Sequence, residues 1–166
     1  MKKLLSVLTI LLCLLLFGCN KKIKCEVNVY RSGINTRDYS IDPVNHKSVY
    51  DLLDEKCYLF KEYEDFEKFI NDNDLVLSEE IESKYSKEFF KDKSFILHLG
   101  TDPSSGYQYK FNLYKEENVL KLNIEKSIDR RFDYPAVVVN RLFLLDIDKD
   151  KIADTNEFIY STSVSD

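Results

Sequence analysis

The chain has 166 residues, with 24 Lys and Arg against 29 Asp and Glu, so its formal net charge is −5. This length corresponds to one globular domain, and an aromatic content of 13% argues against a largely disordered chain. The acidic balance disfavours functions built on phosphate neutralisation, because nucleic-acid binders concentrate Lys and Arg on one face. We therefore expect no nucleic acid among its partners.

The N-terminal residues are typical of a bacterial export signal. A Met-Lys-Lys start is followed by an apolar run, Leu4 to Phe17, that is too short for a comfortable membrane span. The run ends in Leu-Phe-Gly-Cys19, which resembles the lipobox of bacterial lipoproteins. The resemblance implies that residues 1–18 are removed and that Cys19 carries a diacylglyceryl group and acyl chains. The alternatives are an ordinary cleaved signal and an uncleaved anchor.

The lipoprotein interpretation predicts both the segments of the chain and its place in the cell. Residues 19–47 hold the lipid-bearing Cys19, an N-terminal strand and a polar linker, and residues 48–166 form the globular domain. Lys21, Lys22 and Lys24 follow the anchor either as a soluble tether, which we favour, or as contacts to anionic headgroups. We expect the protein in the bacterial cell envelope, lipid-anchored to a membrane outside the cytoplasm.

Of the four cysteines, Cys13 lies in the removed segment and Cys19 carries the lipid, which leaves Cys25 and Cys57 in a compartment that permits oxidation. A Cys25–Cys57 disulfide would pin the N-terminal segment to the domain and stabilise it by about 3 to 4 kcal/mol. The alternative is two buried free thiols. The sequence leaves both open.

The first half of the mature chain contains two short strands and two helices. The alternating run Cys25–Tyr30 predicts a strand, residues 31–47 a loop, and Tyr58–Phe60 a short strand. Aromatic residues at helical spacing predict a helix over Tyr63–Ile70. A second helix is expected over Ser78–Phe90, with Ser78 as its N-cap.

The second half consists of β-branched and aromatic runs separated by turn residues. Short turns between consecutive strands favour an antiparallel meander. The predicted fold class is α+β, with two helices packed on a mostly antiparallel sheet of about five to six strands, and the alternative is a β-sandwich. The predicted strands are Ser94–Leu99, Tyr107–Tyr114, Val119–Ile124, Ala136–Ile147 and Phe158–Val164.

Several short strings between Tyr58 and Lys149 carry a family resemblance. Tyr-Glu-Asp-Phe-Glu-Lys-Phe at 63–69, Tyr-Ser-Lys-Glu-Phe-Phe at 85–90, Ser-Ser-Gly-Tyr at 104–107 and Phe-Leu-Leu-Asp-Ile-Asp-Lys at 143–149 follow one another in that order. This succession resembles small bacterial lipoproteins related to the protease-complex accessory subunit PrcB. The resemblance implies an accessory or binding lipoprotein and supplies no catalytic residues.

A candidate binding loop consists of Asp102, Pro103, Ser104, Ser105, Gly106 and Tyr107. It resembles the Asn-Pro-Thr-Thr-Gly-Tyr loop of chagasin-type cysteine-protease inhibitors. The chain has no later Gly-Gly loop, and it has no Trp for the third inhibitory loop of that family. A plain β-turn, with Pro103 at a corner and Gly106 at a positive φ, is the interpretation we favour.

An acidic string near the C-terminus is a candidate calcium loop. Counted from Asp146, carboxylates fall at the spacing of EF-hand-like loops, and Ile152 would offer the backbone carbonyl. Lys151 stands where that pattern requires Gly, so any affinity would be weak. The alternative is a solvated hairpin turn. The candidate ligands of Ca²⁺, the one cofactor considered, are Asp146, Asp148, Asp150, Ile152, Asp154 and Glu157.

No catalytic motif is visible in the sequence. It has two His, at 46 and 98, and no nucleophile elbow, zinc-protease motif or phosphate-binding loop. A Cys57 nucleophile paired with either His is the weak exception, and we expect no enzyme. The sequence therefore predicts a membrane-anchored, protein-binding or accessory lipoprotein with an envelope protein as partner. A protease inhibitor and a calcium-stabilised module are the alternatives.

Overall fold

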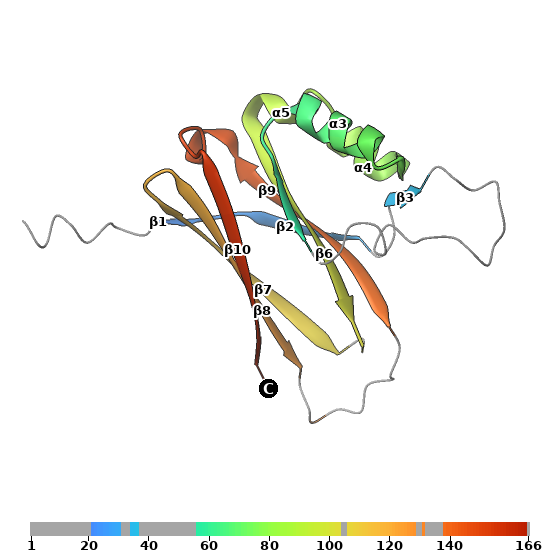
Figure 1. Cartoon of the computed structure of the whole chain (residues 1–166), viewed down its shortest axis with the longest axis vertical. Coiled ribbons are helices and arrows are strands. Elements are labelled where there is room, and N and C mark those ends of the chain that lie inside the picture. Colours follow the sequence, from blue (N-terminus) through green and yellow to red (C-terminus); the bar gives the residue numbers. More distant parts are fainter. Residues whose placement is uncertain are drawn as a thin grey trace, which may run out of the picture.

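The computed structural model describes residues 21–30, 34–36, 56–103, 106–128, 131 and 138–165. Within them the chain forms two four-stranded sheets, a separate two-stranded ladder and three short helices. The two sheets face each other, and the helices cover the outer face of one of them (Figure 1). The architecture is a β-sandwich with a helical third layer.

The inner sheet lies between the helices and the other sheet, and all of its neighbouring strands are antiparallel. β6 and β9 form its centre through ten paired residues each. In spatial order its strands are β2 (Glu26–Tyr30), β9 (Val139–Asp148), β6 (Lys93–Asp102) and β4 (Cys57–Phe60).

The outer sheet has one face toward solvent. Its strands are, in spatial order, β1 (Lys21–Ile23), β7 (Tyr107–Glu116), β8 (Val119–Ile128) and β10 (Glu157–Ser165). β1, β7 and β8 are antiparallel, whereas β10 runs parallel to β8. The parallel pair arises because β9, between them in sequence, belongs to the inner sheet, so the chain returns beside β8 in the same direction.

The helical layer is short and irregular. The two-stranded ladder of β3 and β5 belongs to the same layer. A 3-10 turn (η1) directly follows β9. These elements are α3 (Tyr63–Asp72), α4 (Glu79–Lys84), α5 (Phe89–Asp92), β3 (Ile34–Thr36), β5 (Leu75–Leu77) and η1 (Lys149–Lys151).

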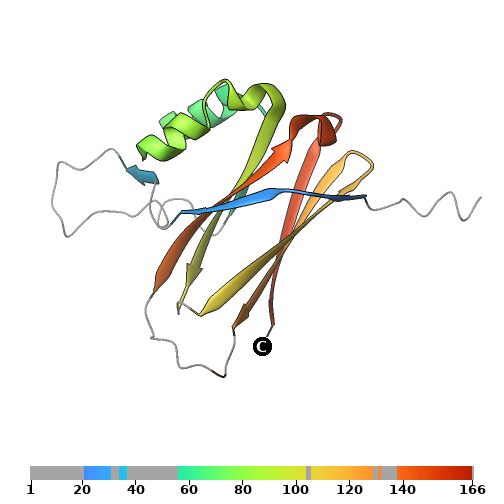
Figure 2. The same cartoon turned by 180° about the vertical axis from the view of Figure 1, so that it is seen from behind.

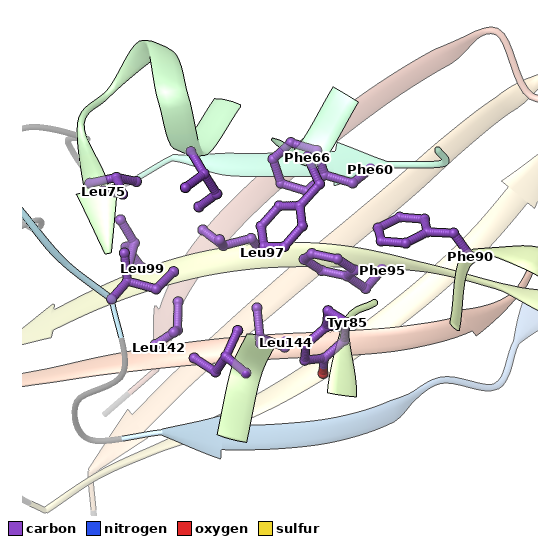
Figure 3. Packing of buried hydrophobic residues seen from close by; sticks show 13 residues of the cluster. Phe60, Phe66, Leu75, Tyr85, Phe90, Phe95, Leu97, Leu99, Leu142 and Leu144 are labelled. Carbon is purple, nitrogen blue, oxygen red and sulfur yellow. The ribbon is translucent and has the colours of Figure 1, made fainter. Parts of the chain in front are cut away.

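An aromatic core fills the space between the helices and the inner sheet (Figure 3). Phe95 of β6 is fully buried at its centre. Its ring centroid lies 4.5 Å from that of Tyr85, 5.0 Å from Phe66 and 5.3 Å from Phe60. Tilted and edge-on ring pairs of this kind add specific geometry to a large buried area, so this cluster fixes the helices on the sheet.

A second core lies between the two sheets. Ile96 and Leu145 of the inner sheet meet Leu113 and Leu122 of the outer sheet, and all four are at most 1% exposed. Because the inner sheet is covered on both faces, β6 is buried almost continuously, whereas β8 alternates buried residues with more exposed ones.

The predicted α+β fold with a single sheet is wrong, and the β-sandwich alternative describes the architecture better. The predicted strand positions in the described residues are confirmed, but successive strands change sheets. Leu142–Ile147 lies in the inner sheet and Phe158–Val164 in the outer one, so the predicted hairpin between them does not form. Alternation identifies a strand with one wet face but does not say which sheet it joins.

Three local predictions also need correction. The predicted loop over residues 31–47 contains a strand, β3, at residues 34–36. The single helix predicted over Ser78–Phe90 is in fact two, because α4 ends at Lys84 and α5 begins only at Phe89. The predicted N-cap is confirmed, since the Ser78 Oγ accepts a hydrogen bond from the Ile81 amide at 3.5 Å. The tether expected just after Cys19 is wrong in part. Residues 21–23 form β1 and pair with β7.

Replacing Phe95 with Ala should destabilise the domain by about 3 to 5 kcal/mol, because it leaves a cavity among five or more rings. Urea unfolding followed by circular dichroism measures this change. Val138→Ala, at a side chain that is 68% exposed, is the control and should leave the midpoint unchanged. Equal effects of the two substitutions would contradict the assignment of this core.

Candidate functional site

The acidic string does not form one ligand cage. Asp146 lies within β9 and is 6% exposed. Its carboxylate accepts hydrogen bonds from Tyr85 Oη at 2.8 Å and Asn28 Nδ2 at 3.1 Å, and Lys84 Nζ lies 2.9 Å away. Asp146 therefore ties the C-terminal end of α4 to the inner sheet and adds a side-chain contact between the neighbouring strands β9 and β2.

The other members of the string are occupied elsewhere. Asp148 pairs with Lys93, Asp150 with its neighbour Lys151, and Asp154 with Lys115 of β7. Ile152 is fully buried in the core between the sheets, and Glu157 starts β10. Among the described residues, no three or more His, Cys, Asp or Glu are grouped so that they could hold a metal ion. The geometry thus lacks the ligand set that the calcium hypothesis requires.

Cys25 and Cys57 are both free thiols, so the candidate disulfide is absent. Cys25 immediately precedes β2 and Cys57 begins β4, which are the two edge strands of the inner sheet. Three interstrand spacings amount to about 14 Å, whereas a disulfide requires Cα atoms within about 7 Å. The order of the strands therefore prevents the bond.

The structure does bring Cys57 beside His98, with 3.3 Å between Sγ and Nδ1. Both are buried, at 8% and 2% exposed, and His98 stacks on Phe143. Burial raises the pKa of the Cys57 thiol to about 12. A catalytic pair requires an accessible thiolate, so this contact has the character of a core interaction rather than of a nucleophile and its base.

The candidate loop at 102–107 begins with a buried carboxylate. Asp102 is 2% exposed and accepts hydrogen bonds from Tyr109 Oη at 2.7 Å and Arg141 Nη1 at 3.2 Å. Lys126 Nζ lies 3.5 Å from its other oxygen. Arg141 also donates to the Tyr107 carbonyl at 2.8 Å. This ionic cluster clamps the ends of β6, β7, β8 and β9 together at one end of the sandwich.

The remaining loop residues differ in their exposure. Pro103 is exposed, Gly106 is buried and Tyr107 is half-buried. Ser104 and Ser105 lie outside the described residues. The described part of the loop therefore offers mainly Pro103 and Tyr107 to a partner.

The outer sheet has a strand position beside β7 that no described strand fills along its whole length. β1 pairs with β7 only from Leu113 to Lys115, after which the chain crosses to the inner sheet as β2. In the described part of the chain, no strand pairs with that edge of β7 over residues 107–112. Figure 2 shows β1 and β2 as one blue ribbon that crosses from one sheet to the other. The first half of β7, in yellow, lies below this crossing.

An apolar groove of about 340 Å³ lies beside this free edge. Val27 and Val29 of β2 form one wall and face the outer sheet, because they are in register with Leu145 and Phe143, which lie in the core between the sheets. They are nevertheless 40% and 54% exposed, since no described outer-sheet strand covers them. The other lining residues are Tyr107, Tyr109, Phe111, Arg141 and Phe143.

Tyr109 forms the floor of this groove and is held there by its neighbours. Its ring centroid lies 4.5 Å from that of Phe143, and its hydroxyl binds Asp102. Gly100 of β6 lies directly beneath it, where an added Cβ would be only 2.6 Å from the Tyr109 hydroxyl. The alternating aromatic residues of β7 were visible in the sequence as a strand, but its free edge was not.

Cys19 and the rest of residues 1–20 lie outside the described residues, so the lipid-anchor prediction remains a prediction. None of the helices in the described part of the chain is long and apolar enough to cross a membrane. Comparisons with protein-family models, with characterised proteins and with solved structures find no match to this chain.

The buried thiol of Cys57 should resist alkylation in the native protein. At pH 8 a thiol with a pKa of about 12 is ionised in roughly one molecule in 10⁴. Iodoacetamide should therefore label Cys57 only after denaturation, and native labelling should accelerate as the pH rises from 9 toward 12. Peptide mass spectrometry measures both. Rapid native labelling of Cys57 at pH 8, or a cysteine that reacts only after reduction, would contradict this result.

Replacing Asp102 with Asn should destabilise the domain by about 3 kcal/mol, because it removes the anion that faces two largely buried cations. Chemical unfolding measures the effect. Asp148→Asn is the matched control, since its ion pair with Lys93 is solvent-exposed and should leave the midpoint unchanged. If both variants unfold at the wild-type midpoint, the Asp102 cluster has no structural role.

Proposed function

We propose that the protein is a non-catalytic, lipid-anchored binding module of the bacterial cell envelope, which captures an extended segment of a partner protein along β7. The edge of β7 over residues 107–112 carries this proposal, because no strand in the described part of the chain pairs with it and it lies beside an apolar groove whose wall is incompletely covered. Main-chain groups along a free strand edge are a ready template for another strand.

The bound segment would occupy the vacant strand position of the outer sheet. Its backbone would pair with β7, and every second side chain would point into the groove against Val27, Val29 and Tyr109. Backbone hydrogen bonds would give affinity, and the groove would select the alternate side chains. Covering the two valines is a favourable apolar contribution to binding.

The lining of the groove indicates the chemistry of the partner segment. It contains no carboxylate, and its single charged residue, Arg141, already contacts Asp102 and the Tyr107 carbonyl. A charged side chain pointing inward would therefore be desolvated without a matching partner. We infer an uncharged segment with β-branched or other apolar residues at alternate positions.

The proposed anchor suits this arrangement. Cys19 is two residues before β1, so an acylated Cys19 would hold the β1 end of the outer sheet within about 7 Å of the lipid. Lys21 of β1 pairs with Lys115 of β7. Tyr107, at the start of β7, is eight residues before Lys115 and therefore about 27 Å from it along the strand. The far end of the groove would thus be well separated from the anchored end.

The absence of catalysis is part of the proposal, and the buried, unionised Cys57 beside His98 supports it. Inhibition of a cysteine protease through residues 102–107 gains no such support. Asp102 and Gly106 are buried in the sandwich, and Asp102 serves as a structural anchor for Tyr109 and Arg141.

A synthetic nonapeptide with alternating Val and Thr and a Lys at each end should bind the full chain in mild detergent. Val29→Lys should weaken binding at least about tenfold, because it places a charge in the groove at a side chain that is already 54% exposed. Fluorescence anisotropy of the labelled peptide measures affinity. Amide hydrogen exchange should show new protection within residues 107–112.

Thr162→Lys, on the opposite edge of the outer sheet, is the matched control and should bind the peptide as wild type does. A peptide with Pro at its central positions should not bind, since it lacks the required amide donors. Equal affinity of Val29→Lys and wild type, or protection confined to other strands, would overturn the proposal.

A further inference from the structure

The outer sheet has a second free edge, on β10. β10 has nine residues and pairs with β8 on one side only, and in the part of the chain that the structure describes no strand pairs with its other side. Exposed edges of this length are usually protected by Lys, Pro or a bulge. Residues 157–165 contain no Lys, Arg or Pro, and Glu157 is their single charged residue.

The side chains of β10 are also unusually exposed for such apolar residues. Ile159 is 42% exposed, Tyr160 41% and Val164 63%. Phe158 and Tyr160 are in register with Leu120 and Leu122, so the even-numbered side chains share the face that looks toward the inner sheet. β4 is too short to cover them along the whole of β10.

The even-numbered residues follow a self-complementary order. Phe158 and Tyr160, in the first half of the strand, are aromatic, whereas Thr162 and Val164, in the second half, are β-branched. An antiparallel copy of the same strand therefore presents β-branched residues where the first presents aromatic ones. Aromatic and β-branched side chains directly opposite each other are among the favourable cross-strand pairs.

We propose that two copies of this chain associate through β10, antiparallel and about a two-fold axis at Ser161. Phe158 then lies opposite Val164 of the second copy, and Tyr160 opposite Thr162. The symmetry repeats both pairs, as an isologous interface requires. The outer sheets join into one continuous eight-stranded sheet, and both copies lose this free edge.

The opposite face of the strand is compatible with the same register. Glu157 lies opposite Ser165 of the second copy and Ile159 opposite Ser163, so no acidic residue within 157–165 faces another one. This matters in a chain with a net charge of −5, because like charges directly opposite destabilise strand pairing. A second copy therefore fits the edge along its full length.

Cysteine crosslinking tests the register. In the full chain with Cys13, Cys19 and Cys25 replaced by Ser, Ser161→Cys should form a disulfide-linked dimer under mild oxidation, because the two 161 positions face each other across the axis. Ser163→Cys is the matched control. Its two copies would lie about 14 Å apart, so it should not crosslink. Non-reducing electrophoresis distinguishes the two.

A second variant tests the edge itself. Thr162→Lys should raise the dimer dissociation constant at least tenfold in sedimentation experiments on the full chain in detergent, because it places two ammonium groups near the axis. Circular dichroism checks that the variant folds. A Ser161→Cys variant that stays unlinked, or equal linking at 161 and 163, would overturn the proposal, as would an unchanged dissociation constant for folded Thr162→Lys. Peptide binding at β7 is a separate measurement, so either proposal can fail alone.

Discussion

The inner sheet is buried on both faces, and the rest of the structure depends on this constraint. In the buried middle of β6 and β9 most side chains are apolar, because a polar group without a partner is costly where neither face has water. Phe95 and Ile96 therefore pack against two different cores, and Asp146 is accommodated only with Tyr85, Asn28 and Lys84 around its carboxylate. The helices are present chiefly to cover this sheet.

The crossing of the chain from β1 to β2 links that constraint to the candidate site. By leaving the outer sheet after Ile23, the chain supplies the inner sheet with an edge strand, but it takes cover away from Val27 and Val29. At the N-terminal end of β7 the Asp102 carboxylate holds the two sheets together, because it accepts hydrogen bonds from Tyr109 of the outer sheet and Arg141 of the inner sheet. An open groove between a rigid clamp and a strand crossover is thus a consequence of the topology.

The sequence predicted the elements much better than their assembly. Alternation located β7 and β8, and the aromatic spacing located α3, because each has one wet face that shows as a period. The division of the sandwich could not be predicted, since a strand's period is the same in either sheet. The groove could not be predicted for the same reason: whether a described strand pairs with this edge of β7 depends on where the rest of the chain runs, and no residue of β7 encodes it.

The acidic string shows why spacing alone misled the search for a site. Carboxylates at every second position can act together as calcium ligands only if the backbone wraps around one point, whereas in a strand they lie on one face in an extended row, about 7 Å apart along the chain. Asp146 and Asp148 are on β9, where the first is buried under α4 and the second pairs with Lys93 at the surface. The extended strand therefore keeps these two acids apart in different surroundings, while the same period places Tyr107, Tyr109 and Phe111 on one face of β7, where they line one groove. The sheet rather than the loop determines which residues can act together.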